Sequence, residues 1–193
     1  MAQLIYFTPT SLDGYIGDGN YDWAAPDDAV MTFINDLERP IGTHLYGRKL
    51  YETMAVWQTP EVIPGATPAM LDFAPIWQAA DKIIYSRSLG TVSTPNTRLE
   101  REFDPQAVRD LKSRVAHDVS VGGPTLAAHA IRVGLVDEIH LLVVPFVLGG
   151  GKRVLPDGIA VPLDLLDERR FGSGWVYLRY RVQPDPRRAS SGA

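Results

Sequence analysis

Short apolar runs alternate with stretches of helical periodicity along most of this chain. The apolar runs are rich in β-branched and aromatic residues and are bounded by turn-forming residues, which is typical of strands. They predict strands over residues 4–8, 43–46, 82–85, 97–102 and 118–121. Between these runs, apolar positions recur every three or four residues, as on one face of a helix. This periodicity predicts helices from Pro26 up to Pro40, over residues 49–55, 75–80 and 105–115, and from Gly122 to Gly134.

The pattern changes in the last third of the chain. Further strands are predicted over residues 138–144, 163–171 and 175–182, and Gly172-Ser173-Gly174 joins the last two as a hairpin. The proline-bearing segment 61–73 is expected to be a surface connection. The Pro-, Arg- and Ser-rich tail, residues 184–193, is expected to be disordered. Alternation of strands and helices, closed by an antiparallel region, predicts an α/β fold in one domain over residues 1–183.

The composition excludes several classes of protein. A chain of 193 residues without cysteine has no disulfide, no thiolate nucleophile and no thiolate metal site. The histidines are scattered without metal-ligand spacing, so we expect no metal. A net charge of -4 offers no basic stripe for nucleic acid, and no run of about 18 apolar residues could span a membrane. A cysteine-free chain without a charged leader is expected to be cytoplasmic.

A first candidate for phosphate binding lies at Gly47-Arg48-Lys49, where a predicted strand gives way to a helix. The start of a helix presents unpaired N–H groups and a partial positive charge, which together favour anions. The Arg48 guanidinium adds a planar set of donors that matches phosphate oxygens. The same sequence also fits a solvated basic turn, and the two interpretations have equal weight.

Two further strand ends carry similar chemistry. Ser86 and Arg87 follow a buried strand and suit a 2′-phosphate, although Ser-Arg pairs are also common on surfaces. Gly122 and Gly123 end a strand directly before a helix, which lets the backbone approach a pyrophosphate without interference from a Cβ atom. A tight structural turn is the alternative there. Neither GxGxxG nor a Walker A motif is present, because Arg153 follows Gly151-Lys152.

Taken in order, these segments resemble the dihydrofolate reductase superfamily, and especially the branch that includes the reductase domain of bifunctional riboflavin-biosynthesis proteins. The resemblance runs from about Leu4 to Val182. The matching motifs are Ser11-Leu12-Asp13-Gly14-Tyr15-Ile16, Gly47-Arg48-Lys49-Leu50-Tyr51-Glu52, Tyr85-Ser86-Arg87, Val121-Gly122-Gly123-Pro124-Thr125-Leu126, Gly134-Leu135-Val136-Asp137-Glu138 and the stretch from Pro145 to Pro156. Each motif is modest alone, but their order is specific.

The resemblance implies a three-layer α/β/α fold, with a mostly parallel central sheet and antiparallel C-terminal strands. It also implies NADPH as the cofactor. The residues placed beside the nicotinamide are Thr8, Pro9, Ile16 and Gly17. Those placed at the coenzyme phosphates are Gly47, Arg48 and Lys49, then Ser86 and Arg87 at the 2′-phosphate, and the segment Val121, Gly122, Gly123, Pro124, Thr125 and Leu126 at the pyrophosphate.

Two acids compete for the catalytic role. The resemblance places Asp28 where folate reductases have the acid that holds the substrate ring and assists its protonation; a carboxyl in the first helical turn is also ordinary capping. Asp13 competes with it, and its alternative role is to satisfy backbone N–H groups of a turn. The resemblance also places Ser11 on this loop, where it implies a role in substrate binding. Trp23 is a possible pocket wall, whereas other large aromatic residues are expected in the core.

These observations lead to two hypotheses. The first is an NADPH-dependent reductase of a small flat heterocycle, which reduces either the aminopyrimidine ribosyl phosphate of the riboflavin pathway or a pterin such as dihydrofolate. The second is a catalytically silent NADP-binding or regulatory protein, because the binding motifs are clearer than any acid–base group. In either case the edges left by the C-terminal strands lead us to expect a homodimer.

Overall fold

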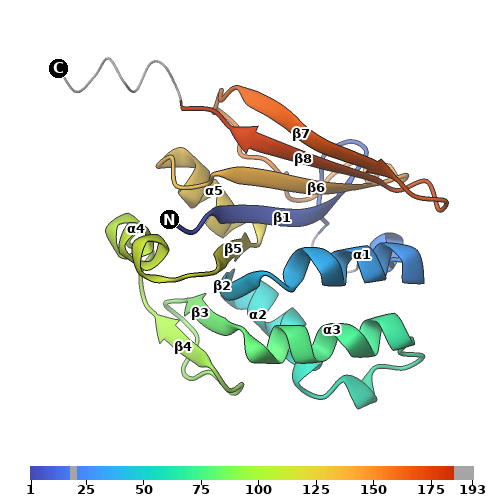
Figure 1. Cartoon of the computed structure of the whole chain (residues 1–193), viewed down its shortest axis with the longest axis horizontal. Coiled ribbons are helices and arrows are strands. Elements are labelled where there is room, and N and C mark those ends of the chain that lie inside the picture. The colour runs from blue at the N-terminus through green and yellow to red at the C-terminus, as the bar shows by residue number, and fades with distance from the viewer. Residues whose placement is uncertain (18–20, 185–193) are drawn as a thin grey trace.

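The computed structural model describes residues 1–17 and 21–184. Within them, one eight-stranded sheet has the order β4-β3-β2-β5-β1-β6-β8-β7 (Figure 1). The strands are β1 (Leu4–Ser11), β2 (Ile41–Gly47), β3 (Asp81–Tyr85), β4 (Thr97–Glu100), β5 (Asp118–Gly122), β6 (Glu138–Val144), β7 (Leu163–Arg170) and β8 (Val176–Val182). The helices are α1 (Asp28–Glu38), α2 (Arg48–Met54), α3 (Pro68–Ala79), α4 (Pro105–Arg114) and α5 (Pro124–Arg132), with 3-10 turns η1 (Asp22–Ala24), η2 (Ala55–Gln58) and η3 (Pro60–Val62).

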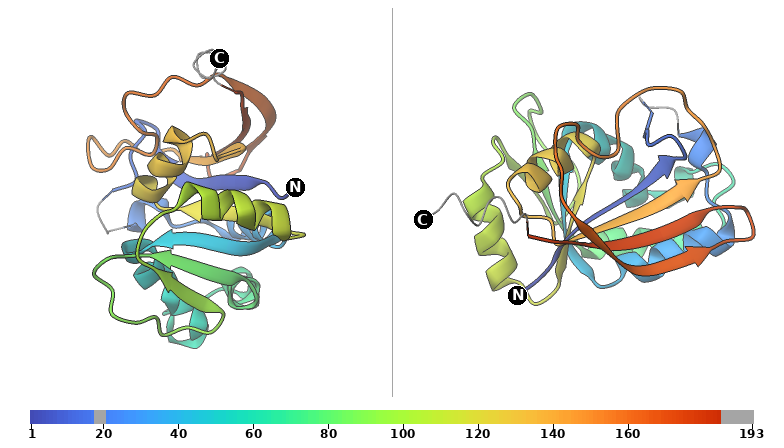
Figure 2. Two further views of the ribbon diagram at one scale, coloured as in Figure 1. Left: turned by 90° about the vertical axis from the view of Figure 1, so that its left-hand side faces the viewer. Right: turned by 90° about the horizontal axis from the view of Figure 1, so that it is seen from above.

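The sheet confirms the expected fold class. Strands β4, β3, β2, β5, β1 and β6 pair in parallel, whereas β8 runs antiparallel to both β6 and β7. Helices α4 and α5 cover one face, and α1 and α3 cover the other (Figure 2). The parallel arrangement brings the carboxyl ends of six strands to one end of the sheet, which we call the carboxyl end.

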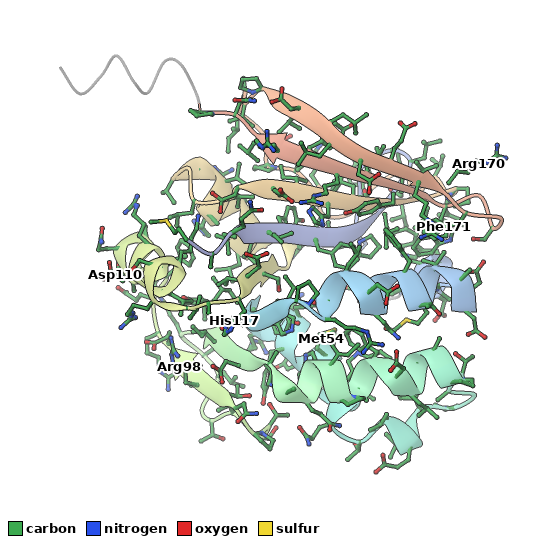
Figure 3. All side chains as sticks on the ribbon, in the orientation of Figure 1. Met54, Arg98, Asp110, His117, Arg170 and Phe171 are labelled. Atoms are coloured by element: carbon green, nitrogen blue, oxygen red, sulfur yellow. The ribbon has the colours of Figure 1, made fainter. Side chains whose placement is uncertain are left out.

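Side chains alternate between the two faces of the sheet, as the pleat requires. Leu45 packs with α4 and α5, whereas the next residue, Tyr46, faces the α2 side. On the other side, Val30 of α1 packs with Phe171, which lies at the β7–β8 hairpin (Figure 3). Full burial of one such apolar side chain stabilises a fold by about 1.5–3 kcal/mol, so both layers contribute to stability.

Helix α3 corrects the expectation for the segment between residues 61 and 80. A surface connection over 61–73 and a short helix over 75–80 were expected, but one helix runs from Pro68 to Ala79. Thr67 caps it, Pro68 occupies its first position, where no N–H is needed, and Pro75 is tolerated inside it. Phe73 and Trp77, four residues apart, pack together against α1. This burial outweighs the helix-breaking tendency of proline.

Strand β1 is also longer than expected, since it continues through Pro9 to Ser11. Its pairing with β5 ends at Tyr6, while its pairing with β6 continues to Ser11. On the unpaired flank, proline removes no ladder hydrogen bond. Of the tail for which disorder was expected, residues 185–193 lie outside the described part of the chain. In the described part, no helix is long and apolar enough to cross a membrane.

Candidate coenzyme and substrate site

The carboxyl end of the sheet brings together the three predicted phosphate-binding junctions. Tyr46 pairs with Gly122, and Gly47 pairs with Tyr85, so β2, β3 and β5 end side by side. Gly47 and Gly123 are the N-cap residues of α2 and α5. Thr125 is exposed near the start of α5, whereas Val121 and Leu126 are buried in the core below it. The sequence therefore predicted which segments would meet.

Gly122 is required by packing between two of these junctions. A Cβ atom at Gly122 would lie 2.4 Å from Cδ2 of Leu50 on α2 and 3.0 Å from the Tyr46 ring. Gly123 has φ +83, a conformation that other residues rarely adopt, and Pro124 begins α5 directly after it. The paired glycines thus allow α2 to lie close against the β5–α5 turn. The Leu50 side chain covers Gly122, whereas Gly123 is half-buried and carries no Cβ atom.

Two arginines at these junctions are exposed and weakly paired. Arg48 lies 3.2 Å from Glu52, with about half of each side chain exposed. Arg87 lies 3.1 Å from Glu102, and both of those side chains are largely exposed. Exposed ion pairs of this kind contribute about 0–1 kcal/mol. Either guanidinium can therefore exchange its carboxylate for a phosphate at little cost.

Ser86 and Arg101 shape the loop that carries Arg87. The Ser86 hydroxyl oxygen accepts hydrogen bonds from the backbone nitrogens of Leu89 at 3.0 Å and Ser88 at 3.3 Å. The Arg101 guanidinium donates to the backbone oxygens of Leu89 at 2.5 Å and Ser86 at 3.2 Å. Arg101 could not be predicted from the sequence, because its acceptors are backbone groups of another loop, which no sequence pattern reveals.

Asp13 ties two loops together at the carboxyl end of the sheet. One carboxylate oxygen accepts from the Ser11 hydroxyl at 2.6 Å and from the Leu148 backbone nitrogen at 3.0 Å. The other accepts from the Gly149 backbone nitrogen at 2.7 Å. These hydrogen bonds, that from Ser11 foremost, lower the pKa of Asp13 to about 2. Asp13 is thus an ionised tether between two loops, which resembles its predicted alternative role of accepting from backbone N–H groups.

The same two loops contact along their backbones. Ile16 donates its N–H to the Lys152 carbonyl at 2.9 Å, and Val154 donates to the Gly14 carbonyl at 3.0 Å. Gly151 has φ +113, and a Cβ atom there would lie 3.2 Å from Cα of Gly17. Glycine at position 151 is therefore needed for the stretch after β6 to lie this close to the loop after β1.

The hydroxyl groups of β1 are engaged within the protein. Ser11 is buried, and besides donating to Asp13 its oxygen accepts from the Tyr15 backbone nitrogen at 2.9 Å. Thr8 is buried as well and donates to the Pro9 carbonyl at 3.1 Å. Here the Ser11 side chain supports the loop, and a role at the substrate stays a prediction.

Asp28 lies at the start of α1, but its neighbour caps the helix. Asp27 accepts from the Val30 backbone nitrogen at 2.8 Å, and this bond is the largest cause of the lowered pKa of Asp27. The Asp28 side chain is exposed, rather than enclosed by the apolar wall expected around a pterin-binding acid. A catalytic role for Asp28 stays a prediction.

Apolar side chains gather beside these loops. Trp23 and Phe146 have ring centroids 6.0 Å apart at an angle of 30°. Leu12 donates its backbone N–H to the Phe146 carbonyl at 2.8 Å, and Leu12, Phe146 and Val147 are all exposed. We call Leu12, Trp23, Phe146 and Val147 the apolar rim. Trp23 was predicted as a pocket wall and Phe146 was not, whereas Trp77 is fully buried in the core, as expected.

The motif from Gly134 to Glu138 has a structural role at the opposite end of the sheet. The Asp137 carboxylate accepts from the Leu4 backbone nitrogen at 2.6 Å and from the Lys112 ammonium at 2.5 Å. Glu138 is buried, and Arg179 donates to it at 2.7 and 3.0 Å. This motif therefore fastens β6 to its neighbours and lies away from the coenzyme junctions.

The sheet order and the junctions at its carboxyl end define a dihydrofolate reductase-like α/β protein. The chain belongs to the family of RibD C-terminal domains, whose model matches residues 2–177. It is 29% identical to an uncharacterised protein of Bacillus subtilis (strain 168), YyaP, with 92% of this chain and 94% of that protein covered.

Solved structures share the fold. A Shewanella sp. PV-4 protein provisionally assigned to riboflavin biosynthesis has a TM-score of 0.73 at 18% identity, covering 95% of this chain and 100% of that one. A Thermotoga maritima diaminohydroxyphosphoribosylaminopyrimidine deaminase/5-amino-6-(5-phosphoribosylamino)uracil reductase has a TM-score of 0.65 at 15% identity, covering 94% of this chain and 57% of that one. Membership of this family supports a riboflavin-pathway-like reductase as the functional class.

Proposed function

We propose that the protein is an NADPH-dependent reductase of a small, flat heterocyclic substrate. The observation that carries this proposal is the meeting of Arg48, Arg87 and the Gly122-Gly123 turn at one end of the sheet, in a chain of the RibD C-terminal domain family. Two exposed guanidiniums and a half-buried glycine, Gly123, at the start of a helix fit the phosphates of a dinucleotide.

Each group has a distinct task in this proposal. Arg48 and Lys49 would bind the coenzyme phosphates at the start of α2, and Gly122 and Gly123 would let the backbone approach the pyrophosphate. The loop held by Ser86 and Arg101 would present Arg87 to the 2′-phosphate, which distinguishes NADPH from NADH. When bound, the nicotinamide supplies the hydride.

The substrate would lie against the loops after β1 and β6. Thr8, Pro9, Ile16 and Gly17 are the proposed nicotinamide-facing residues. The apolar rim offers aromatic faces on which a flat ring can stack, and such stacking orients a ring while excluding water from it. Asp28, at the start of α1, is the proposed source of the proton that completes the reduction.

The test is turnover by the purified protein. NADPH oxidation should be observed with 5-amino-6-(5-phosphoribosylamino)uracil or with dihydrofolate, and Asp28→Asn should lower kcat more than it changes the KM for NADPH. Absence of turnover with these substrates and with other small carbonyl compounds would refute the enzymatic part of the proposal.

A second candidate is a catalytically silent NADP-binding protein. The exposure of Asp28 favours this alternative, because a proton donor usually lies inside a pocket that encloses the substrate. The hydrogen bonds of Asp13 to Leu148 and Gly149 also favour it, because they already occupy the carboxylate of the other proposed acid. Thermal stabilisation by NADPH without turnover would support this alternative.

We also propose a homodimer. Strand β7 is an edge of the sheet and exposes Leu163 and Leu165. Exposed apolar residues on an edge strand favour association with a second chain. Leu165→Glu should halve the mass measured by light scattering, whereas Val62→Glu, which changes an exposed valine of η3 distant from β7 in the sequence, should not. A monomeric wild-type protein would contradict the proposal.

A further inference from the structure

Helix α1 ends in a buried carboxyl group. The Glu38 side chain is almost fully buried, and within the described residues its Oε2 atom has no hydrogen-bond partner. The carbonyl dipoles at the C-terminal end of a helix disfavour negative charge nearby. A charged carboxylate at this position would thus face both an apolar environment and an unfavourable dipole.

The nearest basic group does not neutralise Glu38. His44 on β2 is buried, and its Nδ1 atom lies 3.8 Å from Glu38 Oε2, which is too long for a hydrogen bond. That nitrogen instead lies 2.7 Å from the Ser120 hydroxyl oxygen on β5. The imidazole ring also stacks on Tyr46, with centroids 5.2 Å apart. The histidine is thus directed at Ser120, not at the carboxyl group.

A small cavity lies beside these groups. Its volume is about 10 Å³, and its lining includes Glu38, Ser120 and His140 among the apolar side chains of Ile5, Phe7 and Leu37. This volume is close to the least that one water molecule needs. His140 cannot serve such a water, because its ring nitrogens are engaged by Glu138 at 2.9 Å and by the Tyr177 hydroxyl at 3.1 Å. Glu38 and Ser120 are the two polar groups that can.

We propose that Glu38, His44 and Ser120 form an internal site that holds one proton and one water molecule, the proton on the Glu38 carboxyl group and the water between Glu38 and Ser120. A protonated carboxyl needs no buried countercharge, and its O–H can donate to the water. The water in turn gives Oε2 the hydrogen-bond partner that a buried polar atom requires. A neutral His44, 2.7 Å from the Ser120 hydroxyl oxygen, completes the chain of hydrogen bonds that runs from Glu38 through the water and Ser120.

The surrounding charges are consistent with this assignment. Titratable and charged groups near the site are His44 and Tyr46 on β2, Lys82 on β3, and His140, Glu138 and Arg179 on β6 and β8. The Lys82 ammonium donates to the backbone oxygens of Trp77 at 3.0 Å and Ala80 at 2.7 Å. Glu138 is already paired with Arg179. None of these contacts supplies a donor to Glu38.

The direction of titration follows from burial. Burial raises the pKa of Glu38 to about 7, and burial together with the nearby Lys82 charge lowers the pKa of His44 to about 3. An unfolded glutamate ionises near 4.5, so the folded chain retains a proton that the unfolded chain releases. The stability contributed by this proton is complete below the unfolded value and is lost as the pH rises through the folded value.

The experiment compares urea unfolding of the wild-type protein and Glu38→Gln between pH 5 and pH 8. The amide resembles the protonated acid at every pH, and the His44 contribution is common to both proteins. The unfolding constant of the wild type, relative to that of Glu38→Gln, should rise up to about tenfold per pH unit between about pH 5 and pH 7 and then level off. Asp36→Asn, on the exposed side of the same helix, is the control: the unfolding constant of the wild type relative to that of Asp36→Asn should not change with pH.

Infrared difference spectroscopy gives a second measurement that does not depend on the variant folding. The wild-type protein should show the carbonyl band of a protonated carboxylic acid at pH 6, and this band should disappear at pH 9. A flat unfolding ratio from pH 5 to pH 7, or no such band at pH 6, would overturn the proton site. A high-resolution crystal structure with a dry cavity would overturn the water assignment.

Discussion

The carboxylate of Asp13 lies 2.7 Å from the backbone nitrogen of Gly149, although the two residues are 136 positions apart in the sequence. This contact fixes the loop after β1 to the loop after β6. The proposed nicotinamide-facing residues Ile16 and Gly17 lie on the first loop, and Phe146 lies on the second. Together with the backbone hydrogen bonds between these loops, the Asp13 carboxylate therefore sets the relative position of the proposed coenzyme and substrate residues.

Asp13→Asn should loosen this connection. An amide nitrogen directed at the N–H of Leu148 or Gly149 would replace an acceptor with a donor. We expect the KM values for NADPH and substrate to rise on the order of tenfold, as for loss of a charge-assisted hydrogen bond. Asp157→Asn, at an exposed acid of the same connection, is the control and should behave as the wild type. Unchanged KM values for Asp13→Asn would contradict the tethering role.

The low pKa of Asp13 adds a pH prediction. Because the folded pKa of Asp13 is about 2, below the usual value of 3.8 for an aspartate, the tether is ionised throughout the neutral pH range. Its contribution to stability is present above the unfolded value and is lost as the pH falls through the folded value. The KM for NADPH should thus show no inflection attributable to Asp13 between pH 5 and pH 9. An inflection in that pH range that the wild type shows and Asp13→Asn lacks would contradict the low pKa of Asp13.

Arg87→Ala should separate NADPH from NADH. Loss of hydrogen bonds between a guanidinium and a phosphate should weaken NADPH binding by about 10- to 100-fold, while NADH binding changes little. Arg98→Ala is a matched control, because Arg98 is another exposed arginine that pairs with a nearby glutamate, on β4 (Figure 3). Dissociation constants from fluorescence titration provide the measurement. An equal loss of affinity for NADPH and NADH would show that Arg87 does not bind the 2′-phosphate.

Gly122→Ala should destabilise the fold through Leu50. The added methyl group would lie 2.4 Å from Leu50 Cδ2, and overpacking of this kind costs about 1–3 kcal/mol. Leu50→Ala in the same chain should recover part of that loss, which a double-mutant cycle from urea unfolding measures. Gly90→Ala, where no atom lies near the new methyl group, serves as the control. Additive effects at Gly122 and Leu50 would contradict the packing account.

Phe146→Ala should affect substrate more than coenzyme. Removing an exposed ring that faces Trp23 takes away part of the proposed stacking surface, so the KM for the heterocycle should rise several-fold. The dissociation constant of NADPH should stay the same. Val133→Ala, at an exposed apolar residue after α5, is the control. An unchanged KM for substrate would exclude Phe146 from the substrate site.

The sequence predicted most of the strands because apolar alternation and glycine-bounded runs are local signals. It failed at α3, since the contribution of burying Phe73 and Trp77 against α1 cannot be seen from the prolines on either side. Among the site residues, the three junctions were predictable because each combines a strand end with glycine or arginine.

The contacts that complete the site were not predictable, for a different reason. Arg101 binds carbonyl groups of a loop, and Asp13 binds backbone nitrogens far along the chain. Every residue has a backbone carbonyl group, and all but proline have a backbone N–H, so residue types do not reveal these partners. Glu38 likewise looks like an ordinary acid near a helix end, and only the packing of α1 on the sheet shows that it is buried.

The measurement that tests the account most directly is calorimetric titration of the wild-type protein with NADPH and with NADH. If Arg48, Arg87 and the Gly122-Gly123 turn form a dinucleotide phosphate site, NADPH should give a saturable heat with a clearly lower dissociation constant than NADH. No saturable heat from either coenzyme at millimolar concentration would contradict the central claim.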